Sequence, residues 1–220
     1  MTRWELLREI RAAMKDPDRL GDVAAYKGEL SGARARPEVE ARLDGVRGHY
    51  PPVDLEALQR LPDGTLGREY ARFLSTNRLD PIVPTDRVDR VLLARNAFTV
   101  RYAVIHDMVH VLTGFDASWP GEVGVWAFVG GQFYSWGYRV AAVVALLVAP
   151  LRSPLRLREA WRSFWRGWAM GARARLLLAE RLEDRFAQPL DEARRELGVT
   201  GADDGYLPRE LRAAGAVAAR

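Results

Sequence analysis

The spacing of apolar residues is the feature that most constrains this fold. Across residues 86–110, one face of a predicted helix carries Val88, Leu92, Arg95, Thr99, Tyr102, His106 and His110. Helical spacing and capping signals predict further helices over residues 3–15, about 18–30, 37–46, 55–60, 65–75 and 190–197. No segment alternates with a period of two for long enough to predict a strand. The sequence therefore predicts an all-α protein, a single-domain multi-helix bundle.

Composition narrows the class of protein. The chain has 220 residues, of which 48% are hydrophobic and 28% charged, and this balance excludes an intrinsically disordered protein. It contains no cysteine, which excludes a disulfide scaffold and any cysteine-ligated metal site. We expect one helical domain over residues 1–200 and a flexible C-terminal tail over residues 201–220.

The most apolar stretch covers residues 123–151. A transmembrane helix needs about 20 predominantly apolar residues. Arg139 near the middle would be costly in a bilayer, and Gly130-Gly131 weakens a single helix. We therefore favour a buried core segment, or a hairpin that dips into a membrane, over a true span. The N-terminus interleaves charged and apolar residues and lacks the apolar core of a signal peptide.

A basic strip lies on a long helix expected over residues 155–186. Residues 152–181 hold eight Arg and two Glu, a charge of +6, so the rest of this +4 chain sums to −2. Aromatic residues at spacings of three and four interleave with the arginines, as in helices at membrane interfaces. We expect membrane or lipid contacts from Arg158, Trp161, Arg162, Trp165 and Arg166. Packing of the tryptophans in the core is the alternative, and the absence of a recognised motif argues against nucleic acid.

Two of the three histidines lie four residues apart, at His106 and His110. On a helix these positions differ by about 40° around the axis, so both imidazoles reach one point. Asp107 lies about 100° from His106, and its carboxylate can reach the same point or hold a ligating imidazole in place. Glu122 follows Pro120-Gly121 and can be folded back across both histidines by a short turn.

These four polar residues lie within mostly apolar helices, where they are costly unless something pairs them. Two imidazoles and one or two carboxylates form a metal site with open positions for water or substrate. The alternative is that the histidines are ordinary polar residues of a partly apolar helix. His49 lies in a loop with glycine and prolines and is expected to be exposed.

Residues 106–122 also carry a family signature. The segment matches the pattern HDxxH-(x11)-E. In it, His106 and Asp107 are followed after two residues by His110, and after eleven more by Glu122. Further matching segments are LPDGTLG at 61–67, YARFL at 70–74, Asn77 to Pro81, HVLTG at 110–114 and the proline-leucine to glycine-valine region at 189–199. On these residues the chain resembles a bacterial member of the coenzyme Q (ubiquinone) biosynthesis protein numbered four (Coq-four) family, over most of residues 10–200.

The resemblance implies an all-α fold with a hydrophobic lipid tunnel for a polyprenyl tail. It implies a divalent metal, commonly taken as zinc, held by His106, Asp107, His110 and Glu122, which would also be the catalytic residues. Because zinc cannot change oxidation state, iron or manganese is the alternative for redox chemistry.

The implied role is ubiquinone biosynthesis. It would consist of C1 decarboxylation and hydroxylation of a polyprenylated 4-hydroxybenzoate-type precursor, organisation of the biosynthetic complex, or both. The implied partners are the polyprenylated aromatic lipid, a membrane surface, other ubiquinone-biosynthesis enzymes and a second copy of the chain in a homodimer. The expected location is the bacterial cytoplasm, peripheral on the inner membrane.

Two other functions remain open at this stage. One is a non-catalytic scaffold that binds prenyl lipid and carries a structural metal. The other is an HD-type phosphohydrolase, which needs a further upstream histidine, and only His49 is available. The uncharged residues 123–138 also depart from the family pattern and indicate a divergent branch with another substrate or deeper membrane contact. Tyr102, Arg95 and Arg72 are candidate polar contacts of the tunnel, with an ordinary surface or core role as the alternative.

Overall fold

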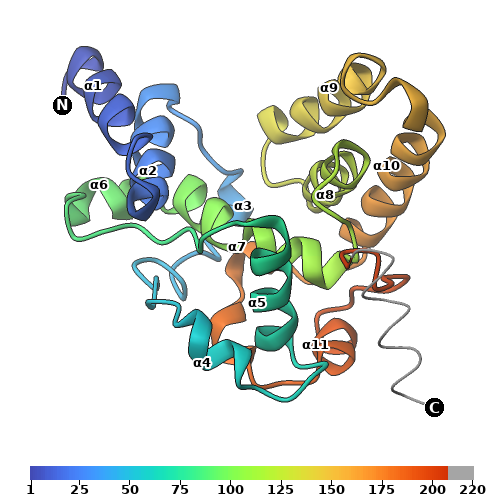
Figure 1. The fold of residues 1–220 in the computed structure, drawn as a ribbon. Coiled ribbons are helices and arrows are strands. Elements are labelled where there is room, and N and C mark those ends of the chain that lie inside the picture. Colours follow the sequence, from blue (N-terminus) through green and yellow to red (C-terminus); the bar gives the residue numbers. More distant parts are fainter. Residues whose placement is uncertain (208–220) are drawn as a thin grey trace.

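The computed structural model describes residues 1–207 and confirms the all-α prediction (Figure 1). Within these residues there is no strand, only an isolated antiparallel bridge between Thr65 and Pro189. The α-helices are α1 Arg3–Ala13, α2 Leu20–Ser31, α3 Pro37–Glu40, α4 Leu55–Gln59, α5 Leu66–Asn77, α6 Arg90–Arg95, α7 Ala97–Thr113, α8 Trp119–Gln132, α9 Trp136–Arg152, α10 Leu157–Gly171 and α11 Leu190–Glu196.

Helix α7 forms the centre of the fold. Figure 1 shows α1 and α2 on one side of it, α8 to α10 on the other, and α4, α5 and α11 below it. Most of its apolar residues are buried, and Val100, Ile105, Met108 and Leu112 are fully so. Because α7 is surrounded on most sides, His110 lies inside the molecule and His106 is partly buried.

The helix predicted over residues 86–110 is wrong in its continuity. The chain forms α6 and α7, with a break at Asn96, whose φ of −105° and ψ of 24° are not helical. The Asp89 carboxylate accepts the Val91 and Leu92 amides and starts α6. Helix α7 then continues beyond the predicted end to Thr113.

The long helix predicted over residues 155–186 is also wrong beyond Gly171. After α10 the chain forms turns and two short 3-10 helices, Leu177–Ala179 and Leu182–Arg185. These place Leu177 and Leu182 in the core and bring Glu183 to the Arg101 guanidinium of α7, at 2.5 and 2.9 Å. Both charged side chains are almost fully buried. A buried charge needs its partner, and a straight helix would keep Glu183 away from Arg101.

The apolar stretch 123–151 divides between two helices of different character. Helix α8 is a core helix, with Val123, Val125, Phe128 and Val129 fully buried. A left-handed residue, Phe133 (φ 53°), ends α8, and α9 follows with one face in solvent. Within residues 1–207 no single helix is long and apolar enough to cross a membrane. The bent pair Trp136–Arg152 and Pro154–Gly171, at 117°, meets that test by length and composition only.

Helices α8 and α10 pack backbone against backbone. A methyl group placed on Gly167 would lie 2.1 Å from the Gly124 carbonyl oxygen, and one on Gly171 would lie 2.0 Å from the Phe128 carbonyl oxygen. Only glycine permits so close an approach. This packing fixes α8, and therefore Glu122, against the body of the protein.

The remaining predicted helices are confirmed with adjusted ends. Asp54 and Thr65 cap α4 and α5 through the Ala57 and Arg68 amides, as their sequence positions indicate. The helix predicted over residues 37–46 shortens to Pro37–Glu40, followed by turns. Of the predicted tail, Tyr206 and Leu207 are buried against the core, while residues 208–220 lie outside the described residues.

Candidate metal centre

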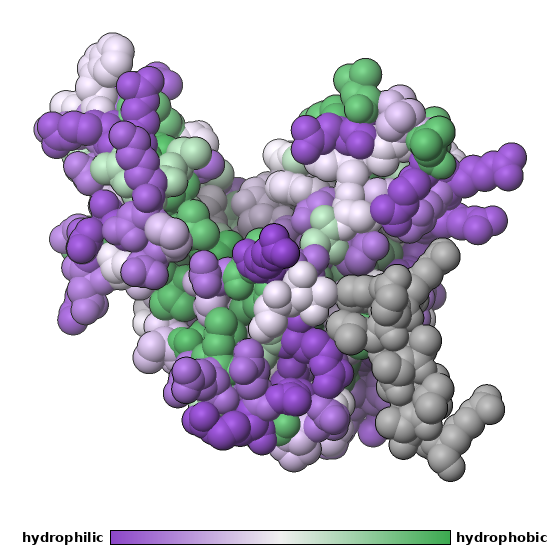
Figure 2. All heavy atoms as spheres, in the orientation of Figure 1, coloured by the Kyte–Doolittle hydropathy of each residue, from purple (hydrophilic) through white to green (hydrophobic). Residues whose placement is uncertain are grey.

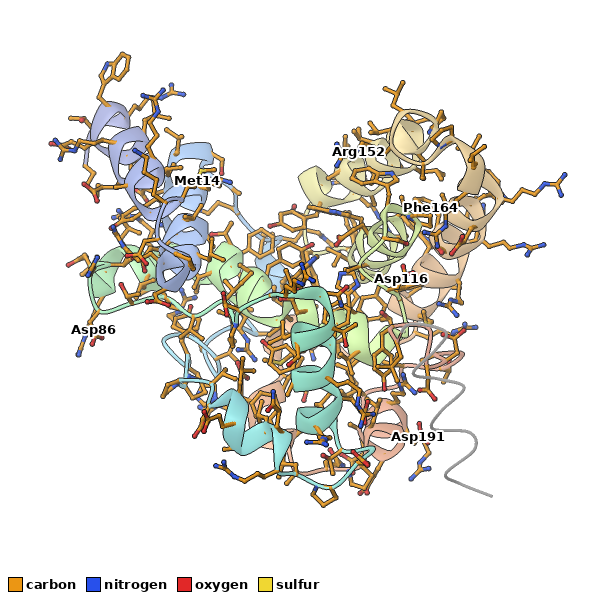
Figure 3. The ribbon with its side chains drawn as sticks, in the orientation of Figure 1. Met14, Asp86, Asp116, Arg152, Phe164 and Asp191 are labelled. Carbon is orange, nitrogen blue, oxygen red and sulfur yellow. The ribbon has the colours of Figure 1, made fainter. Side chains whose placement is uncertain are left out.

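A short connection between α7 and α8 builds the site. Gly114 ends α7 in the left-handed region (φ 76°), and a β-carbon there would meet the Asp203 carbonyl oxygen at 2.1 Å. The His110 carbonyl then accepts both the Gly114 and Phe115 amides. The Asp116 carboxylate accepts the Ser118 amide and hydroxyl, after which α8 begins (Figure 3). Each step turns the chain, so that α8 runs back past α7.

This turn brings Glu122 against both histidines, as the sequence predicts. The Glu122 Oε2 atom lies 3.5 Å from His106 Nε2, and Oε1 lies 3.4 Å from His110 Nε2. A tetrahedral metal with bonds of about 2.1 Å holds its ligand atoms about 3.4 Å apart. Each of these two nitrogen–oxygen distances matches the spacing of two ligands of one metal ion.

The hydrogen bond of His110 fixes which nitrogen faces the cluster. Its Nδ1 atom lies 3.1 Å from the Phe115 carbonyl oxygen, which can only accept. The ring therefore carries a proton on Nδ1, and its Nε2 atom faces the Glu122 carboxylate. A metal-ligating histidine commonly has this arrangement. Phe73 of α5 stacks on the ring at 5.1 Å and holds its plane.

The charges of the cluster are strongly coupled. Burial raises the pKa of the Glu122 carboxyl, but hydrogen bonds from His106 and His110 outweigh burial and hold that pKa well below its ordinary value. Burial lowers the pKa of His106, but the hydrogen bond and charge of Glu122 exceed this effect and raise it overall. The carboxylate thus stays ionised and supplies the negative charge that a divalent cation needs.

Asp107 lies at the edge of this arrangement. A ligand atom each from His106, Asp107 and His110 lie within 4.8 Å of one another. Burial raises the pKa of the Asp107 carboxyl, and the two nearby histidines only partly offset this effect. Asp107 is therefore placed to ligate a cation or to hold an imidazole, as the sequence predicts, whereas Glu122 faces both imidazoles directly.

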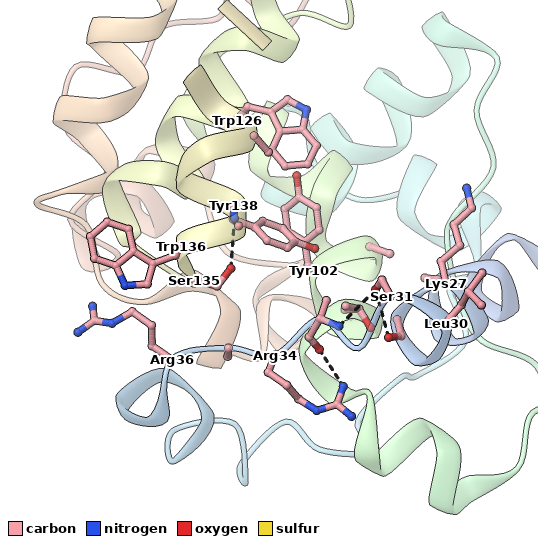
Figure 4. Close-up of a pocket in the computed structure, with 18 of the residues that line it drawn as sticks. Lys27, Leu30, Ser31, Arg34, Arg36, Tyr102, Trp126, Ser135, Trp136 and Tyr138 are labelled. Atoms are coloured by element: carbon pink, nitrogen blue, oxygen red, sulfur yellow. Dashed lines mark hydrogen bonds between the residues drawn. The ribbon is translucent and has the colours of Figure 1, made fainter. Parts of the chain in front are cut away.

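Two cavities lie near the cluster, one beside Tyr102 and one lined by Glu122. The larger, of about 1200 Å³, lies between α2, α7 and α9, and its walls include Tyr102, Trp126 and Tyr138 (Figure 4). Figure 2 shows the open cleft on this side, between the α1–α2 pair and the α9–α10 pair. A second cavity of about 630 Å³ is lined by Glu122, Trp119, Arg152 and again Trp126. Of the four cluster residues, Glu122 lines the second cavity, and Trp126 lies in the walls of both cavities.

Of the three candidate polar contacts, only Tyr102 lines the larger cavity. Arg95 is paired with Glu29 at 2.8 Å, and Arg72 is paired with Glu69 and Asp63. His49 is partly buried rather than exposed, with Nε2 3.6 Å from an Asp184 carboxylate oxygen. Arg95, Arg72 and His49 thus lie beside charged residues outside the cluster.

The predicted membrane contacts on α10 do not share one environment. Trp161 and Trp165 are about half exposed and pack edge to face at 5.7 Å, whereas Phe164 is buried. Arg158 and Arg162 are exposed, but Arg166 is bound to the Asp203 carboxylate at 2.6 Å and lies over the Phe115 ring. One aromatic face is thus divided between core and surface.

Sequence reasoning missed the second cavity and the outer face of α9. Trp119 and Arg152 come from opposite ends of a segment of two helices, and their cation–π contact at 5.0 Å has no local signal in the sequence. The exposed apolar face of α9 comprises Val140, Val144, Leu147 and Leu151. Its spacing of three, four and seven residues is visible in the sequence, but not which side it faces.

Comparison with known proteins gives a consistent result. The sequence profile of the family described as "Coenzyme Q (ubiquinone) biosynthesis protein Coq4" matches residues 48–203. The chain is similar to the mitochondrial ubiquinone biosynthesis protein COQ4 homologues of Danio rerio, with 36% identity over 86% of this chain and 72% of that protein, and of Homo sapiens, with 37% identity over 81% and 71%.

A solved structure has the same fold. It is the crystal structure of a candidate ubiquinone biosynthesis protein from Nostoc punctiforme PCC 73102, with a TM-score of 0.61 and 24% identity over 90% of this chain and 95% of that chain. The profile match covers most of the chain and includes His106, Asp107, His110 and Glu122. By these matches the chain belongs to the coenzyme Q (ubiquinone) biosynthesis protein Coq4 family.

Proposed function

We propose that this ubiquinone biosynthesis protein binds one divalent metal through His106, His110 and Glu122, with Asp107 beside them. It would use the metal to exchange the C1 carboxyl of a polyprenylated 4-hydroxybenzoate-type precursor for a hydroxyl. The observation that carries the proposal is the approach of one carboxylate to two imidazole nitrogens, at 3.4 and 3.5 Å, beside two cavities.

The proposed reaction balances with two co-reactants. The ring loses its carboxyl as carbon dioxide and gains one oxygen atom, while dioxygen and a two-electron donor yield one water. Two histidines and a carboxylate with open positions form the ligand set of non-haem iron oxygenases, so iron or manganese suits this chemistry. Zinc would act only as a Lewis acid on a phenolate or carboxylate oxygen.

The larger cavity supports a prenyl ligand. Its inner wall is a cluster of aromatic rings, with Tyr138 4.9 Å from Tyr102 and 5.6 Å from Trp126 between ring centroids. Such rings favour an apolar chain, and the volume of about 1200 Å³ lies slightly above the usual range for ligand sites. We therefore assign the polyprenyl tail of the lipid to this cavity.

The smaller cavity supports an acidic head group. Arg152 is its only cationic lining residue in the described part of the chain, and it shares the cavity with Glu122. The Trp119 Nε1 atom on the same wall is buried without a hydrogen-bond partner in residues 1–207. A guanidinium and an N–H donor together suit a carboxylate. In this arrangement the ring would lie at the cluster, with its carboxylate toward Arg152.

The outer face of α9 supports contact with a membrane. Leu147 and Leu151 are 70% and 84% exposed, and Figure 2 shows apolar side chains gathered at this end of the molecule. Past the bend, Trp161 and Trp165 continue the surface beside Arg158 and Arg162. Exposed apolar patches with basic neighbours are typical of interfacial binding. We propose a peripheral location on the bacterial inner membrane, from which a prenyl lipid enters the cavity.

Two sets of substitutions separate the parts of this surface. Leu147→Asp with Leu151→Asp is expected to lower binding to neutral and anionic liposomes by more than about tenfold, because each buried leucine contributes about 1.5–3 kcal/mol. Arg158→Gln with Arg162→Gln is expected to lower only the binding to anionic liposomes, by about thirtyfold, since each arginine contributes about 1 kcal/mol. Val91→Asp on α6 is the control, because the Val91 side chain is apolar and about as exposed as that of Leu147 but lies on another helix. Unchanged sedimentation of both double variants would exclude this surface.

The scaffold function shares the same site, so a variant must distinguish it from catalysis. Glu122→Gln keeps the shape of the side chain and removes its charge. We expect the carboxylated prenyl precursor to accumulate in cells that depend on this variant, while lipid binding and stability stay within about twofold of the original protein. Asp116→Asn, the other acidic residue of the connection, is the control and should leave product unchanged. Normal product levels in the Glu122 variant would favour a scaffold that organises the other biosynthetic enzymes, with a second copy of the chain as partner.

A further inference from the structure

The Tyr102 hydroxyl is a buried polar group without a partner. The residue is only 9% exposed, and its oxygen forms no hydrogen bond within residues 1–207. Such a hydroxyl lowers the stability of the fold, because burial removes its hydrogen bonds to water and no protein group replaces them. Buried tyrosines usually satisfy their hydroxyl, as Tyr134 does through Gln132 at 2.7 Å. A hydroxyl left free in this way points to a ligand that completes it.

Tyr102 stands between the larger cavity and the cluster. It lies four residues before His106, on the same face of α7, and its ring meets the His106 ring edge to face at 5.6 Å. It also lines the larger cavity. Figure 4 shows its ring rising from α7 toward Trp126, the residue that both cavities share. Tyr102 therefore contacts both the wall of the larger cavity and one imidazole of the cluster.

The hydroxyl acts as a donor in this position. A phenol carries its proton at neutral pH, so the Tyr102 hydroxyl can donate a hydrogen bond. The surrounding rings of Trp126 and Tyr138 are apolar on the faces that they present. Within the described residues, the Tyr102 hydroxyl is thus an unpaired donor among aromatic rings, in a cavity whose wall also carries polar side chains such as Ser31 and Arg34.

We propose that the Tyr102 hydroxyl selects the head group of the lipid by donating a hydrogen bond to an oxygen substituent on its aromatic ring. Tyr102 is then a specificity residue, which separates ring-oxygenated prenyl aromatics from prenyl chains that lack ring oxygens. This inference rests on the proposed function, which places the prenyl tail in the larger cavity and the aromatic ring at the cluster. It does not depend on which metal is bound or on the reaction itself.

The test compares two ligands on the purified full chain without added metal. One is 4-hydroxybenzoate carrying a short prenyl chain, and the other is the same prenyl chain on an unsubstituted phenyl ring. Tyr102→Phe is expected to weaken binding of the hydroxybenzoate ligand about fivefold to tenfold and to leave the unsubstituted ligand unchanged. The quenching of tryptophan fluorescence reports binding, since Trp126 lies in the cavity wall.

Tyr134→Phe is the matched control. Tyr134 contacts Tyr102 but already has a partner in Gln132, so its loss should lower stability and leave both affinities unchanged. Tyr102→Phe should show the opposite pattern, with stability unchanged or raised, because it removes an unsatisfied hydroxyl. Equal weakening of both ligands, or no weakening of either, would overturn the role of Tyr102 and leave prenyl binding intact. If the original protein bound neither ligand, the result would instead contradict the proposed function, and this inference with it.

Discussion

Replacing His106 with alanine is expected to abolish ubiquinone formation in a strain that depends on this protein. The change removes one of two imidazole nitrogens that face the Glu122 carboxylate at 3.4 and 3.5 Å. Loss of a residue that hydrogen-bonds to a metal ligand already lowers metal affinity or activity by about 10–100-fold. Loss of the ligand itself should therefore lower activity by more than about 100-fold. Ubiquinone extracted from complemented cells and quantified by chromatography is the measurement.

The third histidine provides the control for this experiment. His49→Ala removes an imidazole of the same size, but one that faces Asp184 rather than the cluster. Cells with this variant should make ubiquinone at the normal level. If His106→Ala supported normal synthesis while remaining folded by circular dichroism, the cluster would have no part in the function.

Breaking the buried ion pair that holds α7 is expected to cause the largest loss of stability. Glu183→Leu would leave the Arg101 guanidinium fully buried without its counter-charge. Within residues 1–207, its remaining acceptor would be the Glu180 carbonyl. Removal of one partner from such a pair costs about 3–5 kcal/mol, a large part of the stability of a domain of this size. Urea denaturation followed by tryptophan fluorescence measures the free energy of unfolding.

The double variant Arg101→Met with Glu183→Leu separates charge from packing. Because an apolar pair of similar volume fills the same space without an unpaired charge, it should recover most of the lost stability. Glu38→Gln, in the exposed pair with Arg36, should change the free energy of unfolding little. A double variant as unstable as Glu183→Leu would show that packing, not charge, explains the effect.

The site was predictable from the sequence because its geometry is local. His106 and His110 share a face of any helix, and only eleven residues separate His110 from Glu122. Within that length, a turn that starts at Gly114 and resumes a helix before Glu122 has few arrangements other than a return across α7. The hydrogen bond from His110 Nδ1 to the Phe115 carbonyl lies within the same segment.

The errors in the helices come from contacts between distant residues. Nothing near Gly171 predicts that the chain must leave the helix so that Glu183 can reach Arg101, 82 residues earlier. The break at Phe133 requires a left-handed conformation that is uncommon for phenylalanine, and Arg36 and Arg139 lie over its ring at 4.0 and 3.7 Å. Local propensity carries no information about either set of partners.

The exposed surface shows the same limit. The arginines of α10 suggested a membrane contact from their charge, but Arg166 is engaged with Asp203. The broader apolar surface is that of α9, whose opposite side packs Ala142, Ala145 and Ala149 against α8 and α10. Small residues mark the buried side of α9 and large ones the exposed side. This is the reverse of what hydrophobic burial favours in a helix that meets only water.

Elemental analysis of the natively purified protein tests the central claim most directly. The site predicts about one bound divalent ion per chain in the original protein, and less than about a tenth of that in folded His106→Ala. Identification of the ion as iron or manganese would agree with exchange of a carboxyl for a hydroxyl, and zinc would limit the ion to a Lewis acid. A protein without metal, or stoichiometric metal in His106→Ala, would contradict the assignment of His106, His110 and Glu122 as a metal site.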